Sequence, residues 1–519
     1  MTKQRINIIT ISSIVALGGF LMGFDASVIS GVVKFIVVEF DLTDFELGWG
    51  VSSLTLAATF SMLVSGKLSD RFGRKKVLTY AAILYAVSAL ISAIAPSFII
   101  LVIARMIGGL GVGASLIIAP MYIAEISPAK MRGMMVSFNQ LNIVVGISVA
   151  FFTNYLILQW SQIGGSFINN LISENNSWRW MLGIEAIPAI VYFISLFMVP
   201  KSPRWLIMKG KSDEAQKVLA HVIGEEESII EVESIKKSIE KDKNKKQGSF
   251  GEIFNHSFRN VLIIGVVLAL LQQLVGINAV FFYAPMIFEQ SGFGTNAAFS
   301  QAIIVGLTNL IFTVLAMFLI DKVGRKLLLI VGTLGIALSM IAISYGFSQA
   351  TYTIKENNLI EYSQNSNIEK IKKSNGKTFS SEEDFSVAVK KLIGNESFIK
   401  NKSAIIASSI SVNTYLILIS IMAFVASFAV SIGPVMWVMF SELFPNVIRA
   451  VAMSFVGVIN SSASFMVQLV FPWELSNMGS SLTFLIYGLI AILGLIFILL
   501  KVPETKGKTL EQLEELLTN

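Results

Sequence analysis

Long runs without a charged residue recur along the whole 519-residue chain, and they constrain its fold more than any other feature. Examples are Ile6 to Phe24, Gly133 to Ser173 and Ser403 to Ser441, in a chain that is 54% apolar and 14% charged. About 20 apolar residues cross the hydrocarbon core of a bilayer, so longer runs are tilted helices or hairpins broken at residues such as Pro96. Dividing the longest runs predicts an all-α membrane protein with twelve transmembrane helices in a lipid bilayer.

Lysine and arginine collect in every second connection between these spans, for example from Arg71 to Lys76 and from Lys322 to Lys326. The intervening short connections, such as those around Pro96 and Gly292, nearly lack them. The positive-inside rule therefore predicts a multi-pass protein of the plasma membrane, or of the inner membrane in a bacterium, with both termini cytoplasmic. This asymmetry accounts for the net charge of +6, so we expect no nucleic-acid partner.

The apolar run after Arg5 lacks a small-residue cleavage site, so we expect the first helix to be retained rather than removed as a signal peptide.

The residues for covalent or metal chemistry are scarce. The chain has no cysteine, which excludes disulfides and thiolate metal sites. Its two histidines, His221 and His256, follow Pro200 in a polar region. We expect no cofactor and no metal ion, and no motif indicates an enzyme.

Two polar segments divide the chain. Residues 201–258 are a charged connection in which SDEAQKVLAHVIG and SIIEVESIKKSIEK predict amphipathic helices beneath the membrane. This connection separates an N-terminal six-helix bundle, residues 1–200, from a C-terminal six-helix bundle, residues 259–501. Residues about 349–402 are rich in Ser, Asn, Lys and Glu and predict an extracellular insertion, either an accessory lid or a partly disordered loop. Residues 502–519 are expected to form a cytoplasmic tail.

Motifs of the first half return in the second. DRFGRKK from Asp70 recurs as DKVGRKL from Asp321, and AEISPAKMRG from Ala124 returns as SELFPNVIRA from Ser441. VPKSPR from Val199 is similarly echoed by VPETKG. Parallel repeats of six helices, with a binding site between them near the midplane, are typical of alternating-access transporters.

Seven motifs in order carry a resemblance to a known family. They are GKLSDRFGRKK, PMYIAEISPAKMRG, PKSPRWL, QQLVGINAVFFYAP, DKVGRK, GPVMWVMFSELFPNVIR and VPETKGKT. Over essentially its whole length the chain resembles the sugar porters of the major facilitator superfamily, with more likeness to the bacterial xylose/proton symporters than to the facilitative glucose transporters. The resemblance implies the major facilitator fold and a small neutral sugar as the transported partner.

The charge-free runs of the second half contain four strongly polar amide side chains, at Gln272, Gln273, Asn278 and Asn309. An amide offers a donor and an acceptor together, which suits the vicinal hydroxyls of a sugar. On a regular helix Gln273 and Asn278 would lie about 100° and 240° around the axis from Gln272, so one pocket could not receive all three. Gly276 could permit the necessary break. The alternative is that these amides only tie helices together.

The resemblance extends the sugar-contacting set beyond these amides. It comprises Gln140, Gln272, Gln273, Asn278, Tyr283, Asn309, Gly433, Trp437 and Asn460. Trp437 could stack its ring on sugar C–H groups, or be an ordinary interfacial or packing residue. Met22, Phe282 and Ser461 depart from the xylose symporter pattern, so the pocket has lost a ring and a hydroxyl. Xylose, glucose, another hexose and a polyol all stay open as substrates.

Asp25 follows nineteen uncharged residues, and a carboxylate in hydrocarbon must be paired, protonated or hydrated. Arg105 is its natural partner, since helix rise places the two roughly 20 Å and 12 Å below the same outer surface. The pair is either a permanent salt bridge or a carboxylate that alternates between Arg105 and a proton. By resemblance, the symporters carry Asp here and the facilitators carry Asn. Glu185 is a second intramembrane acid, with coupling or packing as its role.

Charged residues at the predicted cytoplasmic helix ends form two matching sets. By resemblance they are a charge network that keeps the cytoplasmic side closed in the outward-facing state, although such residues are often interfacial anchors. Lys201 stands where many relatives have Glu, so one contact of the network is expected to be missing. The network comprises Asp70, Arg74, Glu125, Arg132, Asp321, Arg325, Glu442 and Arg449.

These observations predict a monomeric secondary transporter that imports a monosaccharide by proton symport through alternating access. A proton-independent facilitator of the same fold is the main alternative. A drug exporter would favour an apolar pocket over the amide cluster, and a sugar sensor would bind without transport.

Overall fold

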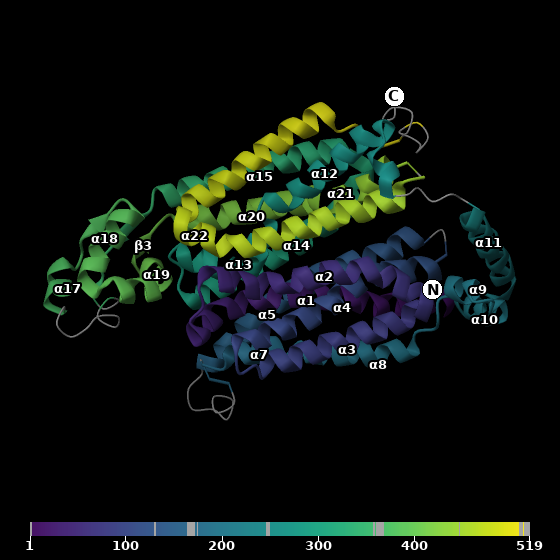
Figure 1. Ribbon diagram of the computed structural model, residues 1–519, viewed down its shortest axis with the longest axis horizontal. Coiled ribbons are helices and arrows are strands. Elements are labelled where there is room, and N and C mark those ends of the chain that lie inside the picture. The colour runs from purple at the N-terminus through teal and green to yellow at the C-terminus, as the bar shows by residue number, and fades with distance from the viewer. Residues whose placement is uncertain are drawn as a thin grey trace.

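Helices dominate the computed structural model, which describes residues 3–128, 131–162, 172–173, 175–244, 250–356, 359, 368–445, 447–507 and 512. They form two bundles that lie side by side (Figure 1). In this described part, eleven helical segments are long and apolar enough to cross a membrane. The last, α22 (Arg449–Lys501), has 53 residues and breaks at Gly479. At about 1.5 Å per residue, 53 residues are long enough for two crossings of a bilayer. The two parts of α22 are therefore two spans, which gives the twelve predicted spans.

The N-terminal half contains six spans. Small residues allow its helices to approach closely: a Cβ on Gly109 or Gly113 of the fourth span would lie 2.2 Å from the carbonyl oxygen of Leu54 or Ala58 in the second. The spans are α1 (Lys3–Phe40), α2 (Asp44–Phe72), α3 (Arg74–Ala93), α4 (Phe98–Ile126), α5 (Arg132–Gln162), and a sixth made of α7 (Ser177–Gly183), α8 (Ala186–Ser195) and η1 (Leu196–Met198).

The C-terminal half also contains six spans, two of which are broken. The first breaks at Gly276 and the fourth at Ser431, so that each is made of two helices. The spans are α12 (Arg259–Leu274) with α13 (Ile277–Gln290), α14 (Thr295–Val323), α15 (Arg325–Ser348), α20 (Thr414–Val430) with α21 (Ile432–Leu443), and the two parts of α22.

The connection between the halves is helical, as its amphipathic pattern predicts. In α10, Ala215, Leu219 and Val222 are buried on one face at helical spacing. Both chain ends lie at the same end of the bundles as this connection, and we call it the inner end (Figure 1). The connection contains α9 (Pro203–Met208), α10 (Ser212–Ile223), α11 (Glu225–Asn244), η2 (Phe250–Phe254) and η3 (His256–Phe258).

The described residues of the insertion fold as a small subdomain at the opposite, outer end. Its sheet has the antiparallel order β2-β1-β3 and lies among short helices (Figure 1). Its buried residues include Phe385 and Phe398. The elements are β1 (Thr351–Thr353), α17 (Ile368–Ser374), β2 (Thr378–Phe379), α18 (Glu382–Ile393), α19 (Asn395–Ser409) and β3 (Ile410–Ser411).

The next span begins later than the uncharged run suggests. We expected it from Ser403, whereas α20 begins at Thr414. Ile405 and Ile410 are buried in the outer subdomain, so their lack of charge reflects a soluble-type core rather than lipid. Residues 357–358 and 360–367 of the expected insertion, and 508–511 and 513–519 of the expected tail, lie outside the described residues.

The two halves meet closely at the outer end and separate towards the inner end. A Cβ on Gly48 of α2 would lie 2.0 Å from the carbonyl oxygen of Leu469 in α22, whereas one on Gly66 or Gly457 of the same helices would meet no described atom within 4 Å. The molecule is therefore closed at the outer end and open between α2 and α22 at the inner end.

Candidate functional site

The break between α12 and α13 brings the predicted amides together. Gly276 has φ of 87° in the left-handed region, where α12 has ended and α13 starts. After this turn, Asn278 Nδ2 donates to Gln273 Oε1 at 2.7 Å. The predicted role of Gly276 in breaking the helix is therefore confirmed.

The amides form a continuous network. Gln273 Nε2 donates to Gln272 Oε1 at 3.2 Å and to Asn460 Oδ1 at 3.1 Å. Asn460 Nδ2 donates to Gln272 Oε1 at 2.8 Å, and Gln272 Nε2 to the carbonyl oxygen of Gly433 at 3.1 Å. Gln272, Gln273 and Asn460 are all buried. Because each amide uses its donor and acceptor, sugar hydroxyls could replace these bonds at small net cost.

Two further residues of α22 and one of α2 extend this network, and sequence reasoning missed all three. Ser464 Oγ accepts from Asn278 at 2.6 Å and from Gln468 Nε2 at 2.8 Å. Thr55 Oγ1 then donates to Gln468 Oε1 at 3.0 Å, which links the network to the N-terminal half. The spacing of Asn460, Ser464 and Gln468 by four residues was the available signal, since it places them on one helix face.

The other predicted sugar-contacting residues lie in different surroundings. Tyr283 is buried at a kink in α13, and its hydroxyl donates to the carbonyl oxygen of Gln468 at 2.8 Å. Asn309 is buried in α14. Gln140 of α5 is exposed, and Trp437 of α21 is 40% exposed while its ring packs edge-on against Phe440. The last two therefore provide surface that a ligand could reach.

The predicted pairing of Asp25 with Arg105 is confirmed. Arg105 Nη1 donates to Asp25 Oδ1, and both side chains are at most 2% exposed. Among the described residues, Asp25 Oδ2, Glu185 Oε1 and Arg105 Nη2 have no hydrogen-bond partner. Glu185 is buried close enough to interact electrostatically with both Asp25 and Arg105, so one arginine lies in a buried site with two carboxyl groups and cannot fully neutralise both.

Glycine and hydroxyl groups shape this buried site. A Cβ on Gly108 would lie 2.9 Å from Asp25 Oδ2 and 2.6 Å from Ser88 Oγ, so only glycine leaves the carboxylate its place. Tyr85 is fully buried within electrostatic reach of Asp25, Glu185 and Tyr192, and neither tyrosine hydroxyl has a hydrogen-bond partner among the described residues. Such a site can hold a carboxyl group either ionised beside Arg105 or protonated.

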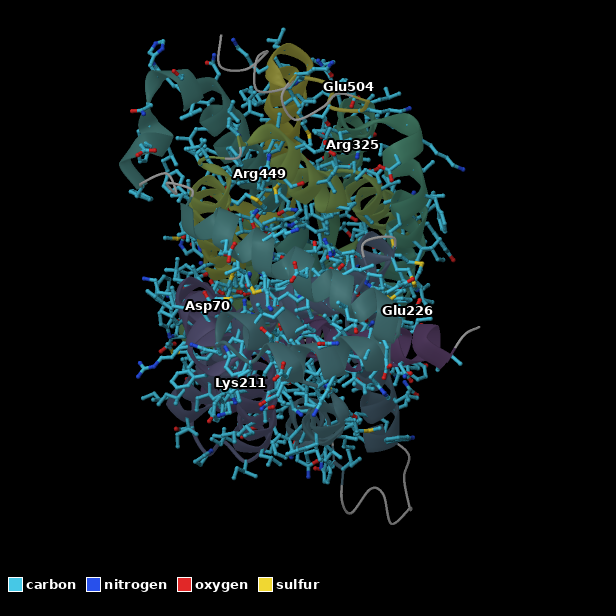
Figure 2. All side chains as sticks on the ribbon, turned by 90° about the vertical axis from the view of Figure 1, so that its right-hand side faces the viewer. Asp70, Lys211, Glu226, Arg325, Arg449 and Glu504 are labelled. Atoms are coloured by element: carbon cyan, nitrogen blue, oxygen red, sulfur yellow. The ribbon has the colours of Figure 1, made fainter. Side chains whose placement is uncertain are left out.

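The charged motifs at the inner end form one network in each half. In the N-terminal half, Arg74 bonds Asp70 at 2.7 Å and Glu125 at 3.0 Å, while Arg132 is exposed. In the C-terminal half, Arg325 bonds Asp321 at 3.0 Å and Glu442 at 2.9 Å, and Arg449 Nε donates to the carbonyl oxygen of Phe444. Figure 2, a view onto the inner end, shows Asp70 in one bundle and Arg325 and Arg449 in the other. These contacts join residues within a half.

Glu504, which sequence reasoning left out, caps the N-terminus of α15 beside the charge network of the C-terminal half. Its carboxylate accepts from the backbone N–H groups of Arg325 at 3.0 Å and Lys326 at 3.1 Å, at the start of α15. Partial burial alone would raise the pKa of Glu504, but the backbone N–H donors lower it below its ordinary value. The repeat of VPKSPR as VPETKG was the available signal.

Lys201 stands at the matching place in the N-terminal half and makes a different contact. Its Nζ lies 3.4 Å from Glu214 of α10, and the neighbouring Ser202 Oγ donates to the Glu125 carboxylate. The ring of Trp205 instead covers the turn at Gly73, where a Cβ would lie 3.2 Å from it. Lys201 thus bonds the linker helix α10, and the expectation that one contact of the network is missing stays a prediction.

Two parallel six-helix halves with broken spans and buried polar groups define a secondary transporter. The model of the family "Sugar (and other) transporter" matches residues 11–365 and 394–517. The chain belongs to this family, the sugar porters of the major facilitator superfamily, and is a sugar transporter rather than an enzyme. Residues 366–393, within the insertion expected at about 349–402, fall outside the match.

Several relatives match the whole chain. The arabinose-proton symporter of Bacillus subtilis is 35% identical over 98% of this chain and 95% of its own length. The D-xylose-proton symporter of Escherichia coli K12 is 34% identical with the same coverage. The glucose transport protein of Synechocystis is 32% identical over 98% of this chain and 97% of its own length.

Solved structures share the fold of this chain. The inward-open structure of the xylose transporter XylE from E. coli has a TM-score of 0.75 at 32% identity, covering 98% of this chain and 100% of that one. The complex of XylE with 6-bromo-6-deoxy-D-glucose has a TM-score of 0.69 at 32% identity, covering 98% and 99%.

Proposed function

We propose that this transporter imports a monosaccharide, D-xylose or a hexose such as D-glucose, together with protons. The observation that carries the proton part is the buried site of Asp25, Arg105 and Glu185, in which one arginine serves two carboxyl groups. Among the described residues the two histidines lie in the connection between the halves, His221 in α10 and His256 in η3 at its end, so a carboxyl group is the available proton carrier within the bundles. Three relatives named above are an arabinose-proton symporter, a D-xylose-proton symporter and a glucose transport protein.

In the proposed cycle, a proton on Asp25 releases Arg105 from its ion pair. The N-terminal half then adopts a different packing, and the two halves rock about a central sugar. A proton crossing roughly 150 mV supplies about 3.5 kcal/mol, enough to concentrate a sugar about a few hundredfold.

The sugar part of the proposal rests on the amide network and its neighbours. Gln272, Gln273, Asn278 and Asn460 would exchange their mutual bonds for hydroxyl groups, while Trp437 and Gln140 offer exposed surface. Asn309, Gly433 and Tyr283 complete the proposed site. The network reaches α2 through Thr55, so sugar binding would act on contacts between the halves.

The inner-end networks are proposed to close the cytoplasmic side in the outward-facing state. In the present conformation Arg74 and Arg325 bond acids of their own half. When the halves approach at the inner end, these networks would meet and also engage Arg132 and Arg449.

The test is uptake of labelled xylose, glucose and arabinose by proteoliposomes, with and without an inward proton gradient. We expect accumulation by the natural chain and its loss in Asp25→Asn, with gradient-free counterflow retained, because the substitution removes the proton carrier and keeps the shape. Glu39→Gln, at the outer end of the same helix, is the matched control and should still accumulate sugar.

Equal, gradient-independent equilibration by the natural chain and Asp25→Asn would instead establish a facilitator. Asp25 would then be a permanent structural partner of Arg105. Binding without any flux would indicate a sensor.

A further inference from the structure

Lys34 of α1 contacts the opposite half at the outer end. Its Nζ lies 2.8 Å from Glu289 Oε1 in the last turn of α13 and 2.5 Å from Thr295 Oγ1 at the start of α14. One lysine of the N-terminal half therefore holds two consecutive helices of the C-terminal half.

The helix that Lys34 holds is connected to the amide network. α13 carries Asn278 in its first turn and Glu289 in its last. Between them Tyr283 departs from helical geometry, with φ of −126°, and Pro285 removes a backbone donor. The outer segment of α13 can therefore change its angle without unwinding the segment that carries Asn278.

By contrast, the ion pairs of Glu39, Arg74 and Arg325 each join described residues of the same half. Glu39 bonds Arg179 at 2.6 Å near the outer end, within the N-terminal half. At the inner end, Arg74 and Arg325 likewise bond acids of their own halves. A relative movement of the halves would leave these pairs intact but would have to break Lys34 from Glu289.

We infer that Lys34, Glu289 and Thr295 form an outer latch, which stabilises the conformation that is closed outside and open inside. The latch lies at the end where the halves meet, away from Gly66 and Gly457, where they are apart. The latch depends on the conformation of the transporter, and neither on which sugar is carried nor on proton coupling.

The size of the effect follows from exposure. The side chain of Lys34 is 44% exposed and that of Glu289 16%, so solvent screens the pair. Partly exposed ion pairs of this kind change an equilibrium by about two- to fivefold. Because external sugar binds only the outward-open fraction, removing the latch should lower the KM for external sugar by about the same factor.

Spin labels can measure this shift directly because the chain has no cysteine. Ile94→Cys and Tyr415→Cys place one label on each half at the outer end, at residues that are each 75% exposed. Pulsed EPR distances should show a larger fraction with the outer end open in Lys34→Gln, Glu289→Gln and Thr295→Val than in the labelled parent. Lys34→Glu should give the largest shift, since it faces Glu289 with a like charge.

In the double variant Lys34→Glu with Glu289→Lys, the fraction with the outer end open should return to within about twofold of that in the labelled parent, because the variant restores an opposite-charge pair. Glu39→Gln breaks an outer ion pair within one half and should leave the populations unchanged. If Lys34→Gln shifts the distances no more than Glu39→Gln does, the latch is wrong. The same holds if the double variant behaves like either single variant, or if external KM does not follow the distances.

Discussion

The turn at Gly276 shows how one residue positions several others. Its left-handed φ of 87° ends α12 and allows Asn278 to reach Gln273. A Cβ at this position would also lie 2.5 Å from the ring of Tyr487. Both the backbone conformation and the neighbouring ring therefore require glycine here.

We expect Gly276→Ala to destabilise the protein by about 2 kcal/mol or more, from the left-handed backbone and the contact with Tyr487. It should also weaken sugar binding, since Asn278 would move away from Gln273. Thermal unfolding in detergent and sugar binding would measure both effects. Gly457→Ala is the matched control, because its Cβ meets no described atom within 4 Å and alanine favours a helix. Equal stability of the two variants would contradict this account.

At the scale of elements, the two halves differ in what packs against the glycine turn before their third span. α3 and α15 both start after a glycine with positive φ, Gly73 at 97° and Gly324 at 105°. The backbone N–H groups at the start of α15 bond Glu504, whereas the ring of Trp205 covers the turn before α3. A carboxylate at a helix N-terminus also interacts favourably with the helix dipole.

We expect Glu504→Gln to lower the free energy of unfolding by about 0.5–2 kcal/mol at neutral pH, the range for loss of a charged helix cap. The folded state lowers the pKa of Glu504 from its ordinary 4.5, so the ionised carboxylate stabilises the fold above that pH. This contribution is lost as the pH falls through the lowered pKa. Unfolding curves of both proteins should therefore differ at pH 7 and converge in acid. Glu214→Gln, on the exposed linker helix α10, should change stability little at either pH.

At the scale of the molecule, α2 and α22 form a seam that is closed only in part. Thr55 bonds Gln468, and Ser461 contacts Met62 seven residues further towards the inner end on both helices. A further four residues along the same faces lead to Gly66 and Gly457, which are apart in this conformation. The register therefore predicts that these two glycines meet when the inner end closes.

Cysteines at positions 66 and 457 should form a disulfide only in the conformation with a closed inner end. Mild oxidation of the Gly66→Cys, Gly457→Cys variant should cross-link slowly, and faster when Lys34→Gln is added, because the lost latch favours that conformation. Mobility on a gel measures the cross-link, and reductant should restore transport. An active variant that never cross-links would refute the register.

Much of the fold could be predicted because, in lipid, the structure of each span is determined by its own sequence. Backbone groups in hydrocarbon must bond within a helix, so uncharged runs indicate spans, and the repeated motifs indicate two halves. The pairing of Asp25 with Arg105 followed from the cost of burying either charge alone. The insertion at about 349–402 was predicted but its internal fold was not, because its short helices and strands bury apolar residues in a core of their own, for which the lengths of uncharged runs carry no signal.

The sequence by itself therefore determined the spans, their division into halves, the buried acid with its arginine, and the break at Gly276. Only the tertiary structure decided which amides bond one another, that Ser464, Gln468 and Thr55 continue the network, and that Lys34 joins the halves. The first group depends on the free energy of transfer from water to lipid and on the backbone conformations that a residue allows, and both are properties of the local sequence. The second depends on how two bundles are placed in one conformation of a cycle, and that placement is a property of the packed molecule.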